Sequence, residues 1–403
     1  MSEKSMHQSR RARRRKRRKI LLIVEIVILV LFLVILFAWL KFGQIRFRDV
    51  GTVKTNKLSE KTVKSLSGYT NFLVLGVDSR GVGTDAVKQG RSDVQMIVSI
   101  NNDTKKIRIA SLYRDTLLNT DPMGSDSKPY QKSNAAYAKG GEKQTLEMVN
   151  GNLDLNLDKF VTFDFKAVTD VIDDLGGVEI DVTDAEYQAF QYKKYDYISE
   201  VARLSGKKAT PVTHSGRQTL NGVQACSLCR IRHAPDHKGD LGRAERQRRV
   251  MAATLEKLRN ASVSQISKII DDVLPQVSTN FSATDILSLA SAAKSYKIEK
   301  SFGFPYSKSI DTIKPWGSVL IPCTLEDNVE RLHQEMFDET NYAPSRTVQK
   351  ISQTIMYKTG KNASSAVDFS IDEGNKGIDD KKDDSSSTSS TTTSSSSSIG
   401  TTN

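Results

Sequence analysis

Four arginines within 229–247 could bind a phosphate group together. Arg230 and Arg232 are two residues apart, so they share a face only if that piece is extended. After Gly239 and Gly242 the sequence becomes helical, which would place Arg243, Arg246 and Gln247 on one face, with Asp240 one turn earlier. A planar guanidinium suits forked hydrogen bonding to phosphate oxygens. The pattern therefore predicts an anion site, and a solvated basic face is the alternative.

Two aspartates stand at the ends of predicted inner strands. Asp78 follows the apolar run 71–77, and Asp93 precedes the run 94–100. Loops at strand ends form the ligand crevice of open α/β sheets, and carboxylates there suit Mg²⁺, which also binds water and substrate phosphate. A role as turn or cap residues is the alternative. Arg80 and Arg114 at similar strand ends favour the functional interpretation.

Four potential zinc ligands also occur in order: Cys226, Cys229, His233 and His237. The gap between the cysteine pair and the histidine pair is shorter than in zinc fingers, and Pro235 interrupts any helix that would align the histidines. We expect the cysteines to pack as small apolar side chains, and a disulfide between them is left open. The sequence lacks a Gly-x4-Gly-Lys-Ser/Thr loop and a Gly-x-Ser-x-Gly elbow, so nucleotide hydrolysis and serine acyl transfer have no support.

The net charge of +12 is concentrated at the N-terminus. Residues 1–20 hold ten lysines and arginines against one glutamate, which leaves about +3 for the rest of the chain. The nearly neutral body argues against a nucleic-acid partner. Three cysteines are too few for a disulfide framework.

A membrane anchor is predicted at 20–40, which carries one charge, Glu25. As a helix this stretch would span about 30 Å, enough for a bilayer core. A cleaved signal peptide is the rival, but the apolar run is long and lacks a small-residue cleavage site. The positive-inside rule makes 1–19 a basic cytoplasmic tail and puts the rest outside, so we expect a single-pass protein of the cell membrane.

The remaining pattern alternates strands with helices. We expect strands at 71–77, 94–100, 106–112, 160–165 and 178–182, helices at 134–139, 142–150, 166–175, 219–228 and 241–260, and closing strands near 301–304 and 319–322. This order indicates an α/β sheet covered on both sides. We interpret 41–69 as a polar stalk or a short helix leading into the domain, 185–211 as an insertion or flap, and 346–403 as a disordered tail rich in serine and threonine.

Together, these features make the chain resemble the LytR-CpsA-Psr family of cell-wall enzymes. The resemblance covers about 70–345 and rests on ordered motifs: NFLVLGVDSR at 71–80, Arg91-Ser92-Asp93, SLYRDT at 111–116, KSNAAY at 132–137 with Gly140-Gly141, LGGV at 175–178, and 230–247. It implies a single extracytoplasmic α/β/α domain with a mixed central sheet on one N-terminal transmembrane helix. The implied activity transfers a glycopolymer from an undecaprenyl-pyrophosphate carrier in the membrane lipid onto peptidoglycan. The reaction would use Mg²⁺ and leave a phosphodiester.

The resemblance also implies residue roles. Asp78 and Asp93 look like the metal-associated carboxylates. The phosphate and sugar-phosphate contacts would be Arg80, Arg114, Lys132, Arg230, Arg232, Arg243 and Gln247. Asp240 would either orient an arginine or activate the acceptor hydroxyl, and Asp115 would support Arg114. The catalytic set is thus expected to be Arg114, Arg230, Arg232, Asp240, Arg243 and Gln247.

Some positions depart from the family pattern, and other functions compete. Tyr113 stands where the family usually has proline, and Cys226, Leu228 and Cys229 replace the usual leucine, tyrosine and small residue. A hydrolase of polyprenyl pyrophosphates, a membrane-bound transcriptional regulator and a wall-binding module without catalysis are the alternatives. Whether the polymer is teichoic acid, capsule or another polysaccharide is left open by the sequence.

Overall fold

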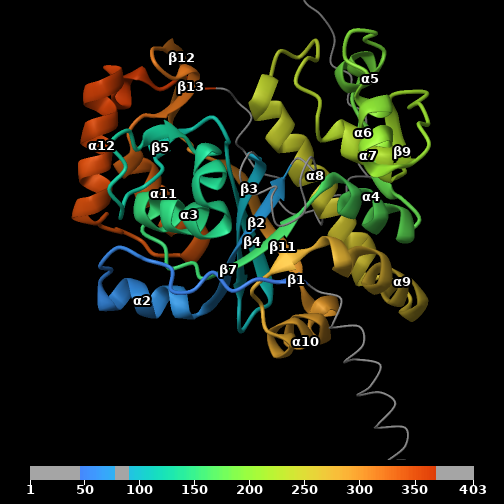
Figure 1. The fold of residues 1–403 in the computed structure, drawn as a ribbon, viewed down its shortest axis with the longest axis horizontal. Coiled ribbons are helices and arrows are strands. Elements are labelled where there is room, and N and C mark those ends of the chain that lie inside the picture. The colour runs from blue at the N-terminus through green and yellow to red at the C-terminus, as the bar shows by residue number, and fades with distance from the viewer. Residues whose placement is uncertain (1–45, 78–89, 369–403) are drawn as a thin grey trace, which may run out of the picture.

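A seven-stranded mixed sheet forms the centre of the computed structural model, which describes residues 46–77 and 90–368. In spatial order the strands are β1 (Arg46–Phe47), β10 (Ser278–Thr279), β7 (Lys159–Phe163), β2 (Tyr69–Val77), β3 (Ser92–Asn101), β4 (Lys106–Leu112) and β11 (Lys297–Phe304). Helices cover both faces of this sheet (Figure 1). The expected α/β class with a mixed central sheet is therefore confirmed.

Strand register brings several strand ends to one edge of the sheet. In the antiparallel pair of β2 and β3, Val77 lies opposite Ser92. The parallel neighbours β7 and β11 finish at the same level, because Phe163 pairs with Gly76 and Phe304 pairs with Leu112. The ends of β2, β4, β7 and β11 and the start of β3 thus share this edge, where residues after one strand can reach residues of another.

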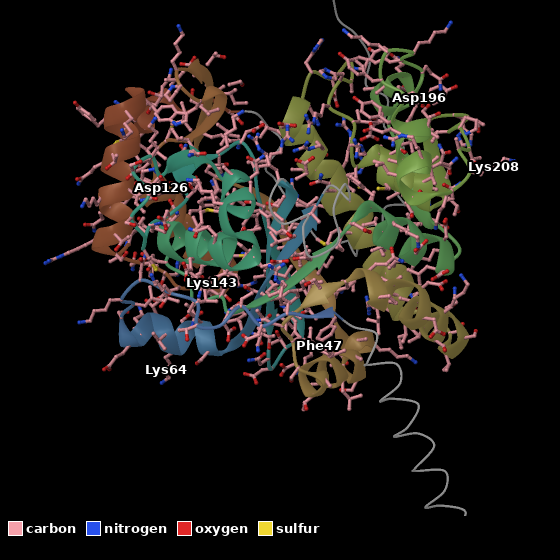
Figure 2. All side chains as sticks on the ribbon, viewed as in Figure 1. Phe47, Lys64, Asp126, Lys143, Asp196 and Lys208 are labelled. Carbon is pink, nitrogen blue, oxygen red and sulfur yellow. The ribbon has the colours of Figure 1, made fainter. Side chains whose placement is uncertain are left out.

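The first face of the sheet packs against α2 (Glu60–Ser67), α3 (Ala135–Leu153), α11 (Leu325–Phe337) and α12 (Arg346–Thr359). Leu73 and Leu75 of β2 belong to this core together with Leu146 of α3 and Val329 of α11, and all four are fully buried. Side chains fill the space between the layers, while charged residues such as Lys64, Asp196 and Lys208 lie at the periphery (Figure 2).

A glycine pair divides α3 into two helical pieces. Gly140 and Gly141 leave helical geometry, and Gly141 has φ +64°. Glycine adopts this left-handed region without the penalty that a Cβ brings. The two separate helices expected at 134–139 and 142–150 are this one kinked element.

The second face carries α8 (Gly239–Arg259) and α10 (Ala283–Ser291), and α9 (Val263–Val273) lies beside α8. Beside them lies a helical lobe made of α4 (Phe165–Asp174), α5 (Asp184–Phe190), α6 (Tyr197–Ser205), α7 (Gly222–Leu228) and the hairpin of β8 (Val178–Val182) and β9 (Gly216–Leu220). Residues 185–211, expected as an insertion, contribute α5 and α6 to this lobe. The site edge of the sheet faces the lobe and the start of α8.

Two hairpins complete the fold beside the first face. They pair β5 (Leu117–Asn119) with β6 (Tyr130–Lys132) and β12 (Lys308–Ile313) with β13 (Gly317–Pro322). A bridge between Thr116 and Leu320 connects the chain after β4 to β13.

Several predicted boundaries differ from the structure. β8 was expected in the α/β sheet but pairs with β9 in a sheet of two strands. The helix expected at 219–228 begins at Gly222, because Asn221 caps it and Leu220 still belongs to β9. The short helix expected within 41–69 is α2, whereas a polar stalk is wrong where the chain is described, because β1 pairs with β10 and Leu66 of α2 is buried in the core. A disordered tail from 346 is also wrong at its start, because α12 packs Val348, Ile351 and Ile355 into the core.

The predicted cytoplasmic tail, the span at 20–40 and residues 369–403 lie outside the described residues. Within the described part of the chain, none of the helices has the length and apolarity that crossing a bilayer requires.

Helix α12 offers a direct test of where the folded domain ends. Ile351 is 3% exposed, and we expect Ile351→Ala to lower the free energy of unfolding by about 2–5 kcal/mol through lost burial and a residual cavity. Tyr357 on the same helix is 90% exposed, so Tyr357→Ala is the matched control and should change it by less than about 0.5 kcal/mol. Urea unfolding of the purified chain measures both, and equal small effects would show that α12 is not part of the core.

Candidate active site

The edge of the sheet gathers most of the predicted site residues into one cluster. Asp93 comes from the start of β3, Arg114 follows β4, Arg232 precedes α8, and Asp240 and Arg243 lie in the first turns of α8. Segments separated by more than a hundred residues thus meet where the strand ends coincide. The prediction that these positions form one site is supported by their geometry.

Arg114 holds the cluster together. Its Nη1 donates to Asp93 Oδ1 at 2.7 Å, and its Nη2 lies 3.4 Å from Asp240 Oδ2. Arg232 connects the same two carboxylates from the other side, with Nε 3.4 Å from Asp240 Oδ1 and Nη2 3.8 Å from Asp93 Oδ2. Each of these aspartates is therefore placed between two guanidinium groups.

Arg243 is the most deeply placed cation of the cluster. Its side chain is 6% exposed, and Nη1 lies 3.5 Å from Asp240 Oδ1. Within the described chain its buried Nε has no hydrogen-bond partner. Burial lowers the pKa of Arg243 to about 10, and the nearby Arg114 and Arg232 act in the same direction. Burial and the neighbouring arginines thus destabilise the positive charge of Arg243. A bound anion would stabilise it, which supports the phosphate prediction.

The three carboxylates have different protonation tendencies. Burial raises the pKa of Asp93 and of Asp240, but other contacts outweigh burial and hold both pKa values below the ordinary range. For Asp93 these are the surrounding arginines, and for Asp240 they are a hydrogen bond with Asp115 and then the same arginines. Burial and a hydrogen bond to Asp240 raise the pKa of Asp115, although Arg114 and Lys132 oppose this. Lys132 Nζ lies 3.2 Å from Asp115 Oδ1. Lys132 therefore reaches the cluster through Asp115.

Two predicted residues lie beside the cluster. Arg230 pairs with Glu200 at 2.7 Å and stacks on the ring of Phe165, with 4.5 Å from its guanidinium carbon to the ring centre. Gln247 donates from Nε2 to the carbonyl oxygen of Cys229 at 3.3 Å. The structure therefore places Arg230 at a neighbouring wall and leaves it outside the ion pairs of Asp93 and Asp240.

Arg246 has a structural role. It pairs with Glu186 and with Asp236 at 2.9 Å each, and it donates to the carbonyl of Ile231 at 3.2 Å. The ion pair with Glu186 is almost fully buried. Arg246 thus fixes the loop that carries Arg232, and the expectation that it shares the phosphate-binding face with Arg243 is wrong.

The cysteines confirm the interpretation of small apolar side chains. Cys226 and Cys229 are free thiols, and Cys226 packs with Val201, Ala202 and Val223. Burial raises the pKa of Cys226 to about 12. Over 46–77 and 90–368, histidine, cysteine and carboxylate side chains form no group of three that could hold a metal ion.

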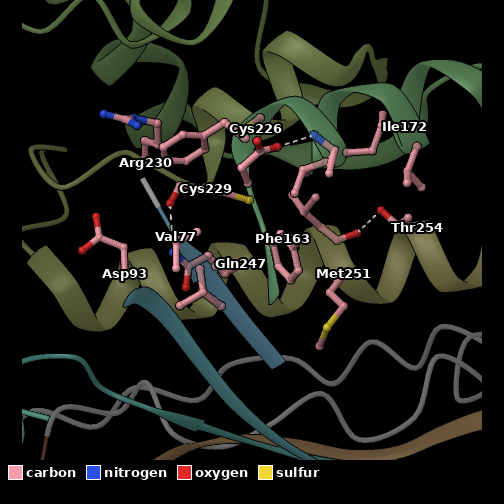
Figure 3. A pocket seen from close by; sticks show the side chains of 18 of the residues that line it. Val77, Asp93, Phe163, Ile172, Cys226, Cys229, Arg230, Gln247, Met251 and Thr254 are labelled. Atoms are coloured by element: carbon pink, nitrogen blue, oxygen red, sulfur yellow. Dashed lines mark hydrogen bonds between the residues drawn. The ribbon is translucent and has the colours of Figure 1, made fainter. Parts of the chain in front are cut away.

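Two cavities meet at the cluster. The larger has a volume of about 690 Å³ and runs between α4, α8 and the sheet, lined by apolar side chains such as Phe163, Ile172 and Met251. Figure 3 shows Asp93 and Arg230 at one end of it and Ile172 and Thr254 at the other. The second cavity, of about 520 Å³, is the more polar of the two and is lined by Arg114, Asp115 and Asp240; we call it the polar cavity. Both are lined by Asp93, Arg243 and Gln247.

Sequence reasoning missed the apolar cavity. A signal existed in α8, where Val250, Met251, Thr254, Leu255 and Leu258 follow helical spacing and all line the cavity. Such a stripe usually packs into a core, so the pattern alone does not indicate a ligand. Asp78 and Arg80 lie outside the described residues, and the described part of β2 ends at Val77.

Arg243 and Arg246 provide a matched pair of variants. Replacing Arg246 with methionine breaks a buried ion pair and should lower the free energy of unfolding by about 3 kcal/mol or more. Arg243→Met removes a poorly compensated buried charge and should change it by less than about 1 kcal/mol. Thermal unfolding measures both. Added inorganic pyrophosphate should raise the Tm of the wild type and of Arg246→Met but not that of Arg243→Met. Equal destabilisation by both substitutions would assign Arg243 a structural role.

The chain is similar in sequence to proteins of known name. It is 33% identical over 236 residues to the Bacillus subtilis (strain 168) protein TagV, named polyisoprenyl-teichoic acid–peptidoglycan teichoic acid transferase, covering 58% of this chain and 54% of the relative. It is 29% identical over 268 residues to TagU of Enterococcus faecalis, which has the same descriptive name, covering 64% and 80%. The chain thus spans about half the length of the first relative and most of the second.

A solved structure shows the same fold. Protein gbs0355 from Streptococcus agalactiae superposes with a TM-score of 0.55 at 28% identity, covering 73% of this chain and 95% of that one. The sequence model of the LytR_cpsA_psr family matches residues 43–313, a range that contains every site residue described above. The chain belongs to the LytR_cpsA_psr family.

Proposed function

We propose that this protein is a Mg²⁺-dependent phosphotransferase that moves a glycopolymer from an undecaprenyl-pyrophosphate carrier onto peptidoglycan through a phosphodiester link. The observation that carries the proposal is the apolar cavity whose polar end is the arginine cluster. An amphipathic ligand with a long hydrocarbon chain and a phosphate head matches both parts. The names of the relatives TagV and TagU, which specify polyisoprenyl-linked teichoic acid and peptidoglycan, agree with this ligand.

The cluster suits a diphosphate electrostatically. Arg114, Arg232, Arg243 and Lys132 stand against three aspartates, so these groups carry a net charge of +1, while Arg230 and Glu200 neutralise each other. In phosphoryl transfer the protein mainly positions the groups and stabilises the charge that develops on phosphate oxygens. Arg243 and Arg232 would hold the diphosphate, and Arg114 would keep Asp93 and Asp240 in place.

One carboxylate oxygen is suited to a metal ion. Asp93 Oδ1 accepts from Arg114, whereas Oδ2 lies 3.8 Å from Arg232, and the side chain is 31% exposed. Mg²⁺ prefers such oxygen ligands and needs only one or two carboxylates besides water and phosphate. Asp93 would hold the ion together with Asp78. The net charge of +1 on the cluster does not neutralise a diphosphate, and a bound Mg²⁺ would supply further positive charge.

The proposed substrate is a membrane lipid, so the site must lie at a membrane. The apolar stretch 20–40 and the basic residues before it support a single-pass anchor with the enzyme domain outside the cell.

The first test is a transfer assay with the full-length chain. We expect a polyprenyl-pyrophosphate-linked oligosaccharide to be joined to peptidoglycan fragments with Mg²⁺ present, and EDTA to stop the reaction. Arg243→Ala should lower the rate at least about hundredfold, because one preorganised cation is lost from the transition state. Arg217→Ala, at an exposed ion pair with Glu179, serves as the matched control and should retain full activity. Release of the phosphorylated oligosaccharide in the presence of acceptor, without a new link, would favour hydrolysis and contradict the proposal.

The second test concerns the apolar cavity. Leu258 lines it, so Leu258→Trp should fill part of the space and weaken binding of a long polyprenyl pyrophosphate at least about tenfold. Inorganic pyrophosphate contacts only the polar end and should bind as it does to the wild type. Glu256 is exposed on the same helix, and Glu256→Trp is the control for a bulky side chain outside the cavity. Unchanged affinity of Leu258→Trp for the long chain would place the carrier elsewhere.

A further inference from the structure

The polar cavity is separate from the space that the carrier chain would occupy. It lies beyond the shared wall of Asp93, Arg243 and Gln247, and it is lined by Arg114, Asp115 and Asp240 together with Tyr113 and residues of the hairpin β12–β13. Its volume of about 520 Å³ is sufficient for sugar rings rather than a single ion. It adjoins the proposed diphosphate position at this shared wall, and its other lining residues are not those of the apolar cavity.

Reaction geometry gives this cavity a role. In phosphoryl transfer the attacking oxygen and the leaving oxygen lie roughly in line on opposite sides of phosphorus. If the lipid phosphate leaves toward the apolar cavity, the attacking hydroxyl must approach from the polar one. Asp115 and Asp240 line this polar side and do not line the apolar cavity.

The two carboxylates differ in their suitability as a proton acceptor. Asp240 is close to Arg114, Arg232 and Arg243, which stabilise its anion and weaken its affinity for a proton. Asp115 is close to Arg114 and Lys132, and when it carries a proton it donates a hydrogen bond to Asp240. The Asp240 anion therefore helps Asp115 to take up a proton.

We propose that the polar cavity binds the acceptor, a hydroxyl-bearing sugar of the peptidoglycan glycan, and that Asp115 accepts its hydroxyl proton. This inference rests on the proposed function. In the step, a bond forms between the acceptor oxygen and the phosphorus attached to the polymer. The bond from that phosphorus to the bridging oxygen breaks, its electron pair goes to the lipid phosphate, and the acceptor proton goes to Asp115.

The far wall of the cavity is tied directly to Asp115. Leu320 donates its backbone N–H to the Asp115 carbonyl at 3.0 Å, and Leu320 also forms the bridge with Thr116. Ser318, Val319 and Leu320 lie beyond the residues matched by the family model, as does Asp368. The catalytic carboxylate is thus positioned by a wall outside the matched region, and this wall would select the acceptor.

The first experiment separates Asp115 from Asp240 by pH. In the transfer assay Asp115→Asn should lose at least about hundredfold in rate, while its affinity for farnesyl pyrophosphate, a probe of the donor site, stays within about twofold of wild type. In the wild type the rate should rise with pH as Asp115 loses its proton. Asp240→Asn removes the neighbouring anion and lowers the pKa of Asp115, so the acid limb of its pH–rate profile should move to lower pH.

These outcomes are distinguishable from failure of the proposed function, in which the wild type itself transfers nothing. If the wild type transfers and Asp115→Asn does too, the assignment of Asp115 is wrong. If Asp240→Asn abolishes transfer at every pH, Asp240 is the base and the inference is overturned. If Asp240→Asn transfers but leaves the acid limb unmoved, Asp115 is not the group that titrates, and the inference is overturned as well.

The second experiment tests what the cavity holds. Ser318 is exposed at its wall, so Ser318→Trp should raise the KM for a peptidoglycan tetrasaccharide at least about tenfold without changing farnesyl pyrophosphate affinity. Lys314, which is exposed in the turn of the same hairpin and does not line the cavity, provides the control Lys314→Trp. An unchanged acceptor KM, or a loss confined to the donor, would show that the acceptor binds elsewhere.

Discussion

The arrangement of three guanidinium groups around two carboxylates is the interaction on which the site depends. Arginines this close repel one another, and Asp93 and Asp240 compensate them only in part, as the buried and unpartnered Nε of Arg243 shows for the described chain. The cost is carried by surrounding structure, in particular by the buried pair of Arg246 and Glu186 that fixes the neighbouring loop. An anion would relieve this repulsion, and the proposed phosphate ligand would meet arginines that are already in place.

The fold brings these charged residues together from distant parts of the chain. Mixed strand directions allow the ends of β2, β4, β7 and β11 to coincide with the start of β3, which brings Asp93 and Arg114 within 2.7 Å. Helix α8 then enters this edge with its first turn, where the positive end of its dipole favours the carboxylate of Asp240 and disfavours Arg243. Backbone and side chains therefore contribute to one positive field directed at the cavity junction.

Much of this could be predicted from the sequence, and the failures have physical reasons. The strand β4 and the helix α8 were predicted nearly residue by residue, because buried apolar runs and glycine breaks are local signals. The partner of β8 could not be predicted, since pairing depends on a strand that is distant in the chain. Distant partners also decide the roles of Arg243 and Arg246. The two residues are three apart on one helix, and the sequence does not distinguish them until their partners are known. Arg246 forms ion pairs with Glu186 and Asp236, and nothing in the sequence indicates that these two carboxylates are its partners.

The junction of the two cavities bears on the order of events in turnover. Because Asp93, Arg243 and Gln247 line both cavities, ligands in the two spaces would meet at these residues. In the proposed step the acceptor oxygen attacks the phosphorus directly, so the enzyme does not hold the phosphoryl group as a covalent intermediate. Both substrates would therefore be present together in a ternary complex. The kinetics would be sequential rather than ping-pong, and the polymer would pass between two large carriers without ever being free in solution.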